Sequence, residues 1–139
     1  MSDTTLLLDT CAVLWVLENA WLKPEAIDAI DRAHDRSRKV YVSPITAWEI
    51  GIMARKGRFR SSYSPRRWLE VLAERPEIAF AGMPPHVLMD SSFLPGALNS
   101  DPADRILVAT AREYGFTLVT RDGDLLRYAR DGHLSALEC

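Results

Sequence analysis

Short apolar runs alternate along the chain with segments whose apolar residues recur at helical spacing. The apolar runs predict strands at residues 5–8, 40–42, 78–80, 116–120 and 134–137, the last of them the weakest. Strands that are separated by helices imply a parallel sheet with right-handed crossovers. We therefore predict a single α/β domain over residues 1–139, a three-layer α/β/α fold around a central parallel sheet of about five strands.

Capping residues and prolines indicate where the intervening helices begin and end. Ser43-Pro44 and Ser64-Pro65 each place a capping side chain before a proline, and Gly115 ends the helix that Asp101-Pro102 begins. Helices are predicted over residues 11–18, from residue 24, between 44 and 57, between 65 and 76, over 85–93 and over 102–114. Residues 95–100 are typical of a loop, and Asp122-Gly123 is typical of a turn.

The composition is that of an ordinary globular protein, with 47% hydrophobic and 26% charged residues. The apolar run at residues 6–8 is too short for a signal peptide or a membrane span. The two cysteines, Cys11 and Cys139, do not form a disulfide framework. We therefore expect a cytoplasmic protein that does not associate with a membrane.

The basic residues are concentrated in one segment of a chain whose net charge is −2. No acidic residue lies between Glu49 and Glu70, whereas the segment carries Arg55, Lys56, Arg58, Arg60, Arg66 and Arg67. This asymmetry indicates an anionic partner. Arginines can contact phosphates, and the aromatic residues Phe59 and Tyr63 can stack on unpaired bases, so we predict RNA contacts at Arg55, Lys56, Arg58 and Arg60. Alternatively, the basic segment is a solvated loop or a surface that binds acidic residues of a partner protein.

Three aspartates map to the edge of the sheet where functional groups gather in open parallel sheets. Asp9 directly follows the first predicted strand, and Asp122 follows the fourth. Asp104 lies in the first turn of a helix that begins at the same edge. We therefore expect these three carboxylates to lie close together.

Glu49 is the fourth acidic residue that we expect at this edge. It lies in the helix after the second strand, on the stripe of Ile45, Trp48 and Ile52. A carboxylate in an apolar stripe is costly unless something compensates its charge. Its side chain leans toward the start of the helix, which is the direction of the sheet edge.

Each acidic residue also has a purely structural explanation. Asp9 and Asp101 suit helix caps, Asp104 suits a capping box, Asp122 suits a turn, and Asp124 suits the cap of the segment after that turn. Four carboxylates in one crevice, however, repel one another, and some of them must take up protons. A divalent cation removes that conflict, and ligands that are all oxygen favour Mg²⁺ or Mn²⁺ over zinc. The conjunction of the four residues therefore predicts an acidic metal site.

The segments that carry these acids resemble the four acidic motifs of PIN domains. In order and spacing they are similar to the VapC-type toxins of bacterial VapBC toxin–antitoxin pairs, and the likeness covers nearly the whole chain. The matching segments are Leu6-Leu7-Leu8-Asp9-Thr10, Ser43-Pro44-Ile45-Thr46-Ala47-Trp48-Glu49-Ile50, Asp101-Pro102-Ala103-Asp104-Arg105 and Leu118-Val119-Thr120-Arg121-Asp122.

The resemblance implies a Mg²⁺- or Mn²⁺-dependent endoribonuclease that acts on RNA, forms homodimers and is inhibited by a cognate antitoxin protein. It makes Asp9, Glu49, Asp104 and Asp122 the core acids, with Asp101 and Asp124 as accessory acids and Ser43 and Thr120 as small polar residues beside the site. Metal held by Asp9, Asp104 and Asp122 is expected to activate a water. Glu49 then holds a second metal ion, orients the water or accepts its proton, and we favour an outer role for it.

Other enzyme classes with an aspartate or a cysteine near the first strand fit less well. A haloacid-dehalogenase-type phosphatase needs a second acid at the position of Cys11, and a cysteine phosphatase needs an arginine that residues 11–17 lack. A dinucleotide-binding domain needs a glycine-rich turn after the first strand, which is absent. The main alternative is a non-catalytic RNA- or partner-binding module on the same fold.

Overall fold

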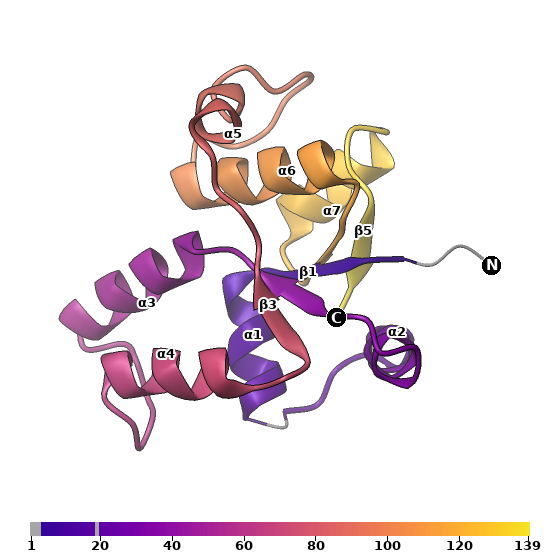
Figure 1. Ribbon diagram of the computed structural model, residues 1–139. Coiled ribbons are helices and arrows are strands. Elements are labelled where there is room, and N and C mark those ends of the chain that lie inside the picture. The colour runs from indigo at the N-terminus through magenta and orange to yellow at the C-terminus, as the bar shows by residue number, and fades with distance from the viewer. Residues whose placement is uncertain (1–3, 19) are drawn as a thin grey trace.

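The computed structural model describes residues 4–18 and 20–139 and contains a five-stranded parallel sheet (Figure 1). Its order is β3-β2-β1-β4-β5, and every neighbouring pair is parallel. The strands are β1 (Leu6–Leu8), β2 (Val40–Val42), β3 (Ile78–Phe80), β4 (Thr117–Thr120) and β5 (Ala136–Glu138). All five strands that the apolar runs predict are therefore present, and only β5 is displaced noticeably from its predicted bounds.

Seven helices connect the strands within the described residues. They are α1 (Thr10–Leu17), α2 (Pro24–Asp35), α3 (Ile45–Arg55), α4 (Pro65–Glu74), α5 (Pro85–Asp90), α6 (Pro102–Tyr114) and α7 (Gly123–Arg130). The prediction of a turn at Asp122-Gly123 was wrong, because Asp122 is the N-cap of α7. Helix α5 is also shorter than predicted, since it ends at Asp90 rather than near residue 93.

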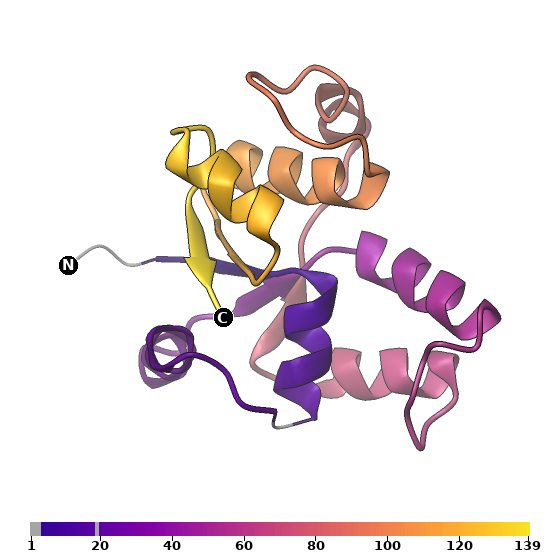
Figure 2. The ribbon, with the colours of Figure 1, turned by 180° about the vertical axis from the view of Figure 1, so that it is seen from behind.

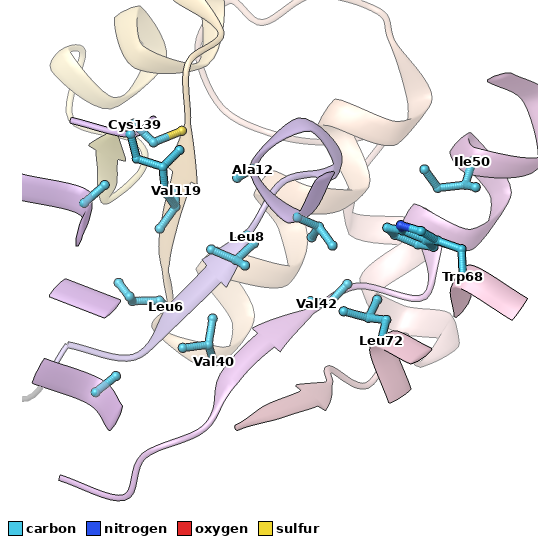
Figure 3. Close-up of a cluster of buried hydrophobic side chains, with 14 residues drawn as sticks. Leu6, Leu8, Ala12, Val40, Val42, Ile50, Trp68, Leu72, Val119 and Cys139 are labelled. Atoms are coloured by element: carbon cyan, nitrogen blue, oxygen red, sulfur yellow. The ribbon is translucent and has the colours of Figure 1, made fainter. Parts of the chain in front are cut away.

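Helices cover both faces of the sheet and give the predicted three layers (Figures 1 and 2). Leu6 and Leu8 of β1 face a cluster that α1, α2 and α4 complete, with Trp68 and Leu72 from α4 (Figure 3). Leu7 points to the other face, where residues of α6 and α7 cover it. This alternation along one strand is what a fully buried strand requires. No helix in residues 4–18 or 20–139 is long and apolar enough to cross a membrane.

The parallel arrangement brings the carboxyl ends of distant strands to one edge of the sheet. β1 and β4 are neighbours in the sheet, with Leu8 opposite Val119. The residues at the carboxyl ends of these two strands therefore meet, although Asp9 and Thr120 are 111 residues apart in the chain. Helices α1 and α7 begin directly after them, so their N-termini lie at the same edge.

Gly115 ends α6 in a left-handed conformation, with φ of 70°. A Cβ atom at this position meets no other atom within 4 Å, so only backbone strain opposes a side chain. Gly115→Ala is expected to lower the free energy of unfolding by about 1 kcal/mol in urea titrations. Gly51 is the matched control because it lies inside α3 in equally open space. Gly51→Ala is expected to raise that free energy by about 0.5–1 kcal/mol, and equal signs for the two variants would contradict this reasoning.

Candidate active site

Asp9 is fixed at the end of β1 by hydrogen bonds to both of its carboxylate oxygens. Oδ1 accepts from the backbone N–H of Ala12 at 2.8 Å, so the residue caps α1 as its structural explanation predicts. Oδ2 accepts from the hydroxyl of Thr120 at 2.6 Å. The side chain is buried, and burial raises its pKa although both hydrogen bonds act in the opposite direction.

Asp122 lies at the end of β4 and is connected to Asp9 through one hydroxyl group. Thr120 Oγ1 donates to Asp9 Oδ2 and also accepts from the backbone N–H of Asp122 at 3.0 Å. Oδ1 of Asp122 accepts from the N–H groups of Asp124 and Leu125 and caps α7. Thr120 therefore sets the position of two core acids at once.

Glu49 reaches the same edge from the second turn of α3. Its Oε1 accepts a short hydrogen bond from Thr10 Oγ1, and the Thr10 hydroxyl also lies 3.2 Å from that of Thr46. Burial is the main cause that raises the pKa of Glu49. The predicted direction of this side chain is confirmed. The predicted apolar stripe is partly wrong, because Trp48 is 51% exposed.

Asp104 lies in the first turn of α6, three residues after its N-cap. Asp101 accepts from the N–H of Asp104 at 3.0 Å and is the predicted cap. Oδ2 of Asp104 accepts from the side-chain amide of Asn99 at 3.1 Å, and the same amide donates to Asp124 at 2.8 Å. Asp104 thus does not close a capping box onto Asp101, since its carboxylate bonds to the loop before the helix.

The four core acids line one cavity of about 320 Å³ at this edge of the sheet. The remaining lining residues are Thr10, Cys11, Trp15, Leu107 and Arg121. The accessory residues Asp101, Asp124, Ser43 and Thr120 are not among them. Asp124 instead forms an ion pair with Arg127 at 2.7 Å, and Ser43 accepts from the N–H of Ile45 at the start of α3. The accessory residues therefore lie outside the lining of the cavity.

The carboxylates in the cavity influence one another as well as being buried. Burial and the negative charges of Asp101, Asp122 and Glu49 raise the pKa of Asp104 to about 6, although the hydrogen bond from Asn99 opposes the shift. Asp122 has the same repulsive effect on Asp9, and Asp9 has it on Glu49. Carboxylates this close together repel one another unless protons or a cation neutralise part of their charge.

The donor set suits a hard divalent cation, because four carboxylates line the cavity. Burial and the neighbouring carboxylates raise the pKa of the Cys11 thiol, which also lines it, and this disfavours the thiolate that a soft metal requires. Glu49 Oε2, Asp104 Oδ1 and Asp122 Oδ2 accept no hydrogen bond from residues 4–18 or 20–139. In that same part of the chain, no three histidine, cysteine, aspartate or glutamate side chains stand close enough to form a closed metal-binding group. The four carboxylates therefore fit a divalent cation by their chemistry, and their side chains have to move closer to one another to coordinate it.

The raised pKa of Asp104 predicts how the metal-free protein responds to pH. The pKa of Asp104 is 3.8 in the unfolded chain and about 6 in the folded protein, so the folded state holds its proton more tightly. The free energy of unfolding therefore falls as the pH rises from about 4 to about 6. In EDTA, the unfolding temperature is therefore expected to be higher at pH 5 than at pH 7. Asp104→Asn removes this contribution and is expected to flatten the profile in thermal unfolding followed by circular dichroism. Parallel profiles for the two proteins would contradict the prediction.

Several residues of the site were given no role by the sequence. Thr10 follows Asp9 directly and Arg121 precedes Asp122 directly, so proximity to a core acid was the available signal. Asn99 lay in the predicted loop, and only its contacts in the fold connect it to Asp104 and Asp124. Cys11 and Trp15 line the cavity because α1 begins at the site.

Comparisons with known proteins agree with this fold. A family model described as the PIN domain matches residues 6–131. The chain is 35% identical over 120 residues to Ribonuclease VapC22 of Mycobacterium tuberculosis, covering 86% of this chain and 88% of that protein.

Solved structures share the fold at low sequence identity. VapBC2 from Rickettsia felis, bound to a DNA fragment from its promoter, aligns over 97% of this chain and 98% of that one, with a TM-score of 0.64 and 11% identity. FitAcB from Neisseria gonorrhoeae aligns over 96% of each chain, with a TM-score of 0.55 and 18% identity. The matched family model and the 35% identity to Ribonuclease VapC22 show that the chain belongs to the PIN-domain family, within its VapC-type group.

Proposed function

We propose that this chain is a metal-dependent endoribonuclease and the toxin of a toxin–antitoxin pair. The convergence of Asp9, Glu49, Asp104 and Asp122 on one cavity is the observation that carries the proposal. The 35% identity to a protein named as a ribonuclease supports the same activity. Phosphodiester hydrolysis needs a deprotonated water and a means to offset negative charge, and a carboxylate site of this kind supplies both when it holds a divalent cation.

Asp9, Asp104 and Asp122 are the proposed ligands of Mg²⁺ or Mn²⁺. When bound, the ion lowers the pKa of a water and offsets charge on the phosphoryl oxygens. Asp9 contributes a side chain that two hydrogen bonds already orient, which lowers the entropy lost on binding. Asp104 and Asp122 each contribute a carboxylate oxygen that has no partner in residues 4–18 or 20–139.

Glu49 takes an outer role in this proposal, as the group that orients the attacking water or accepts its proton. Thr10 holds one carboxylate oxygen, and the other is left for the water. The raised pKa of Glu49 brings the group closer to the range in which a general base works. Asp101, Asp124, Ser43 and Thr120 are proposed to support the site through the helix caps and hydrogen bonds described above.

The basic segment after α3 is the proposed RNA contact on one side of the cavity. Arg55 lies six residues beyond Glu49 on α3, about 9 Å along the helix axis. Arg55, Lys56, Arg58 and Arg60 are exposed and form no ion pair with any residue that the structure describes. Arg67, by contrast, pairs with Glu70 and Glu74, so its charge is partly neutralised.

A cognate antitoxin protein and a second copy of the chain are the proposed protein partners, in the cytoplasm. Membership of the VapC-type group supports the antitoxin. Leu88 and Met89 on α5 are 39% and 68% exposed, and neighbouring exposed apolar side chains are typical of protein interfaces.

The competing function is a non-catalytic RNA- or partner-binding module on the same fold. The two functions separate in an assay of a mixed RNA pool with Mg²⁺ or Mn²⁺, with EDTA, and with the Asp9→Asn variant. A nuclease gives discrete cleavage that requires metal and the intact aspartate. A folded wild-type protein that binds Mn²⁺ and leaves the RNA intact would favour the binding module.

A further inference from the structure

Among the residues of 4–18 and 20–139 that line the carboxylate cavity, Arg121 is the one basic residue. Its Nη2 donates to the backbone carbonyls of Cys139 at 2.9 Å and Trp21 at 3.3 Å. Its guanidinium carbon lies 3.8 Å from the centre of the Trp15 ring, at cation–π distance. Two carbonyls and an aromatic face therefore hold the guanidinium in one place at the wall of the cavity.

The contacts of Arg121 within the protein leave part of its guanidinium free. No aspartate or glutamate side chain in residues 4–18 or 20–139 forms an ion pair with it, although four such carboxylates line the same cavity. Its Nε and Nη1 atoms have no hydrogen-bond partner in that part of the chain. The charge still acts at the site, because it lowers the pKa of Asp9. The guanidinium thus has free donors for an anion that comes from outside the protein.

The backbone carbonyl of Trp21 accepts from Arg121, and the Trp21 side chain is 70% exposed. An exposed indole can stack on an unpaired base, and a fixed guanidinium can contact the phosphate of a neighbouring nucleotide. An acidic peptide also suits the cation, but it gives no reason for the exposed aromatic face. Single-stranded RNA is therefore the better match for the pair.

The position of this pair in the sheet complements that of the basic segment. Arg121 follows β4 and bonds to Cys139 after β5, whereas α3 and the basic segment follow β2. In the order β3-β2-β1-β4-β5, β1 lies between β2 and β4, so Asp9 at the end of β1 lies between the two. An RNA strand that contacts both sides therefore passes over the carboxylates.

We propose that Arg121 and Trp21 form an RNA-binding site on the β5 side of the cavity. Arg121 contacts a phosphate beside the one that is cleaved, and Trp21 stacks on an unpaired base. This inference rests on the proposed function, since it assigns the same cavity a single-stranded RNA substrate. It adds contacts that the basic segment does not provide.

The test measures fluorescence anisotropy of a short, fluorescein-labelled single-stranded RNA of mixed sequence in EDTA, where metal-dependent cleavage is absent. Arg121→Gln is expected to weaken binding about tenfold and to reduce the slope of log affinity against log salt by about 0.7, the loss of one phosphate contact. Trp21→Ala is expected to weaken binding about tenfold with the slope unchanged. Arg130→Gln and Phe93→Ala, an exposed arginine and an exposed aromatic outside the cavity, are expected to bind as the wild type does.

Arg121→Lys separates RNA contact from a structural role, because Arg121 also holds two backbone carbonyls. Lysine keeps the charge, so the salt slope is expected to stay near the wild-type value even where stability falls. Wild-type affinity and slope in both Arg121→Gln and Trp21→Ala would overturn the inference, as would a wild type that does not bind this RNA. A wild type that binds a fluorescent poly-glutamate peptide, with Arg121→Gln and Trp21→Ala variants that lose this binding and keep their RNA binding, would also overturn the inference. That result would favour an acidic protein partner. Cleavage by the wild type with Mn²⁺ is measured in parallel, and its absence counts against the proposed function instead.

Discussion

Asp9→Asn is expected to reduce metal-dependent RNA cleavage by at least about 100-fold while the protein stays folded. Loss of a residue that only supports a metal ligand costs about 10- to 100-fold, so loss of a ligand itself is expected to reach or exceed the upper end. Asparagine keeps an oxygen for the N–H of Ala12, and its amide can donate to Thr120 after the hydroxyl turns. The free energy of unfolding is therefore expected to change by less than about 1 kcal/mol.

The matched control for this variant is Asp35→Asn, an exposed aspartate at the end of α2. It removes the same charge from the molecule and is expected to leave cleavage unchanged. Initial rates on a fixed RNA pool at several Mn²⁺ concentrations provide the comparison, and circular dichroism reports folding. Full activity in well-folded Asp9→Asn would rule out the proposed site. Equal losses in both variants would show that net charge, rather than the carboxylate at Asp9, is responsible.

The centre of the fold was predictable because β1 and most of β4 are buried on both faces. Leu6, Leu7 and Leu8 are all fully buried, so β1 appears in the sequence as an uninterrupted apolar run. The positions of Asp9 and Asp122 then follow from topology, since parallel strands end at a common edge. For these two acids, local pattern and one rule of sheet architecture were sufficient.

The contacts that organise the site were not predictable, because they join distant parts of the chain. The hydroxyl of Thr10 bonds to Glu49 and that of Thr120 bonds to Asp9 only once the sheet has formed. Helix α7 was missed because Asp122-Gly123 is an equally good signal for a turn. Trp48 was misplaced because helical spacing does not determine which side of a stripe a neighbouring element covers.

The structural and functional explanations of the acids are compatible at two of the four core positions. Asp9 caps α1 and Asp122 caps α7, and both line the cavity. A helix N-terminus stabilises a nearby negative charge, so the caps offset part of the repulsion between the carboxylates. The N-termini of α1 and α7 thus help to hold several negative charges together in the absence of a cation. Because they offset only part of the repulsion between the carboxylates, the cavity still attracts a cation.

Thr120→Val is expected to weaken the site without removing any proposed metal ligand. Valine matches the shape of threonine, but Asp9 Oδ2 and the N–H of Asp122 lose their shared partner. Leaving buried polar groups without partners is expected to lower the free energy of unfolding by about 1–3 kcal/mol in urea. The Mn²⁺ concentration for half-maximal cleavage is expected to rise about 10- to 100-fold, because the ligands are less well oriented.

Thr110→Val is the matched control for this substitution. Thr110 is equally buried, but its hydroxyl donates only to the carbonyl of Ile106 within α6, where backbone hydrogen bonding already satisfies that oxygen. It is expected to leave the Mn²⁺ dependence unchanged. High Mn²⁺ is expected to restore cleavage by Thr120→Val and not by Asp9→Asn, because the ligands are intact only in the former. An unaltered Mn²⁺ dependence in Thr120→Val would show that its hydroxyl stabilises the fold alone, and that Asp9 and Asp122 reach their positions without it.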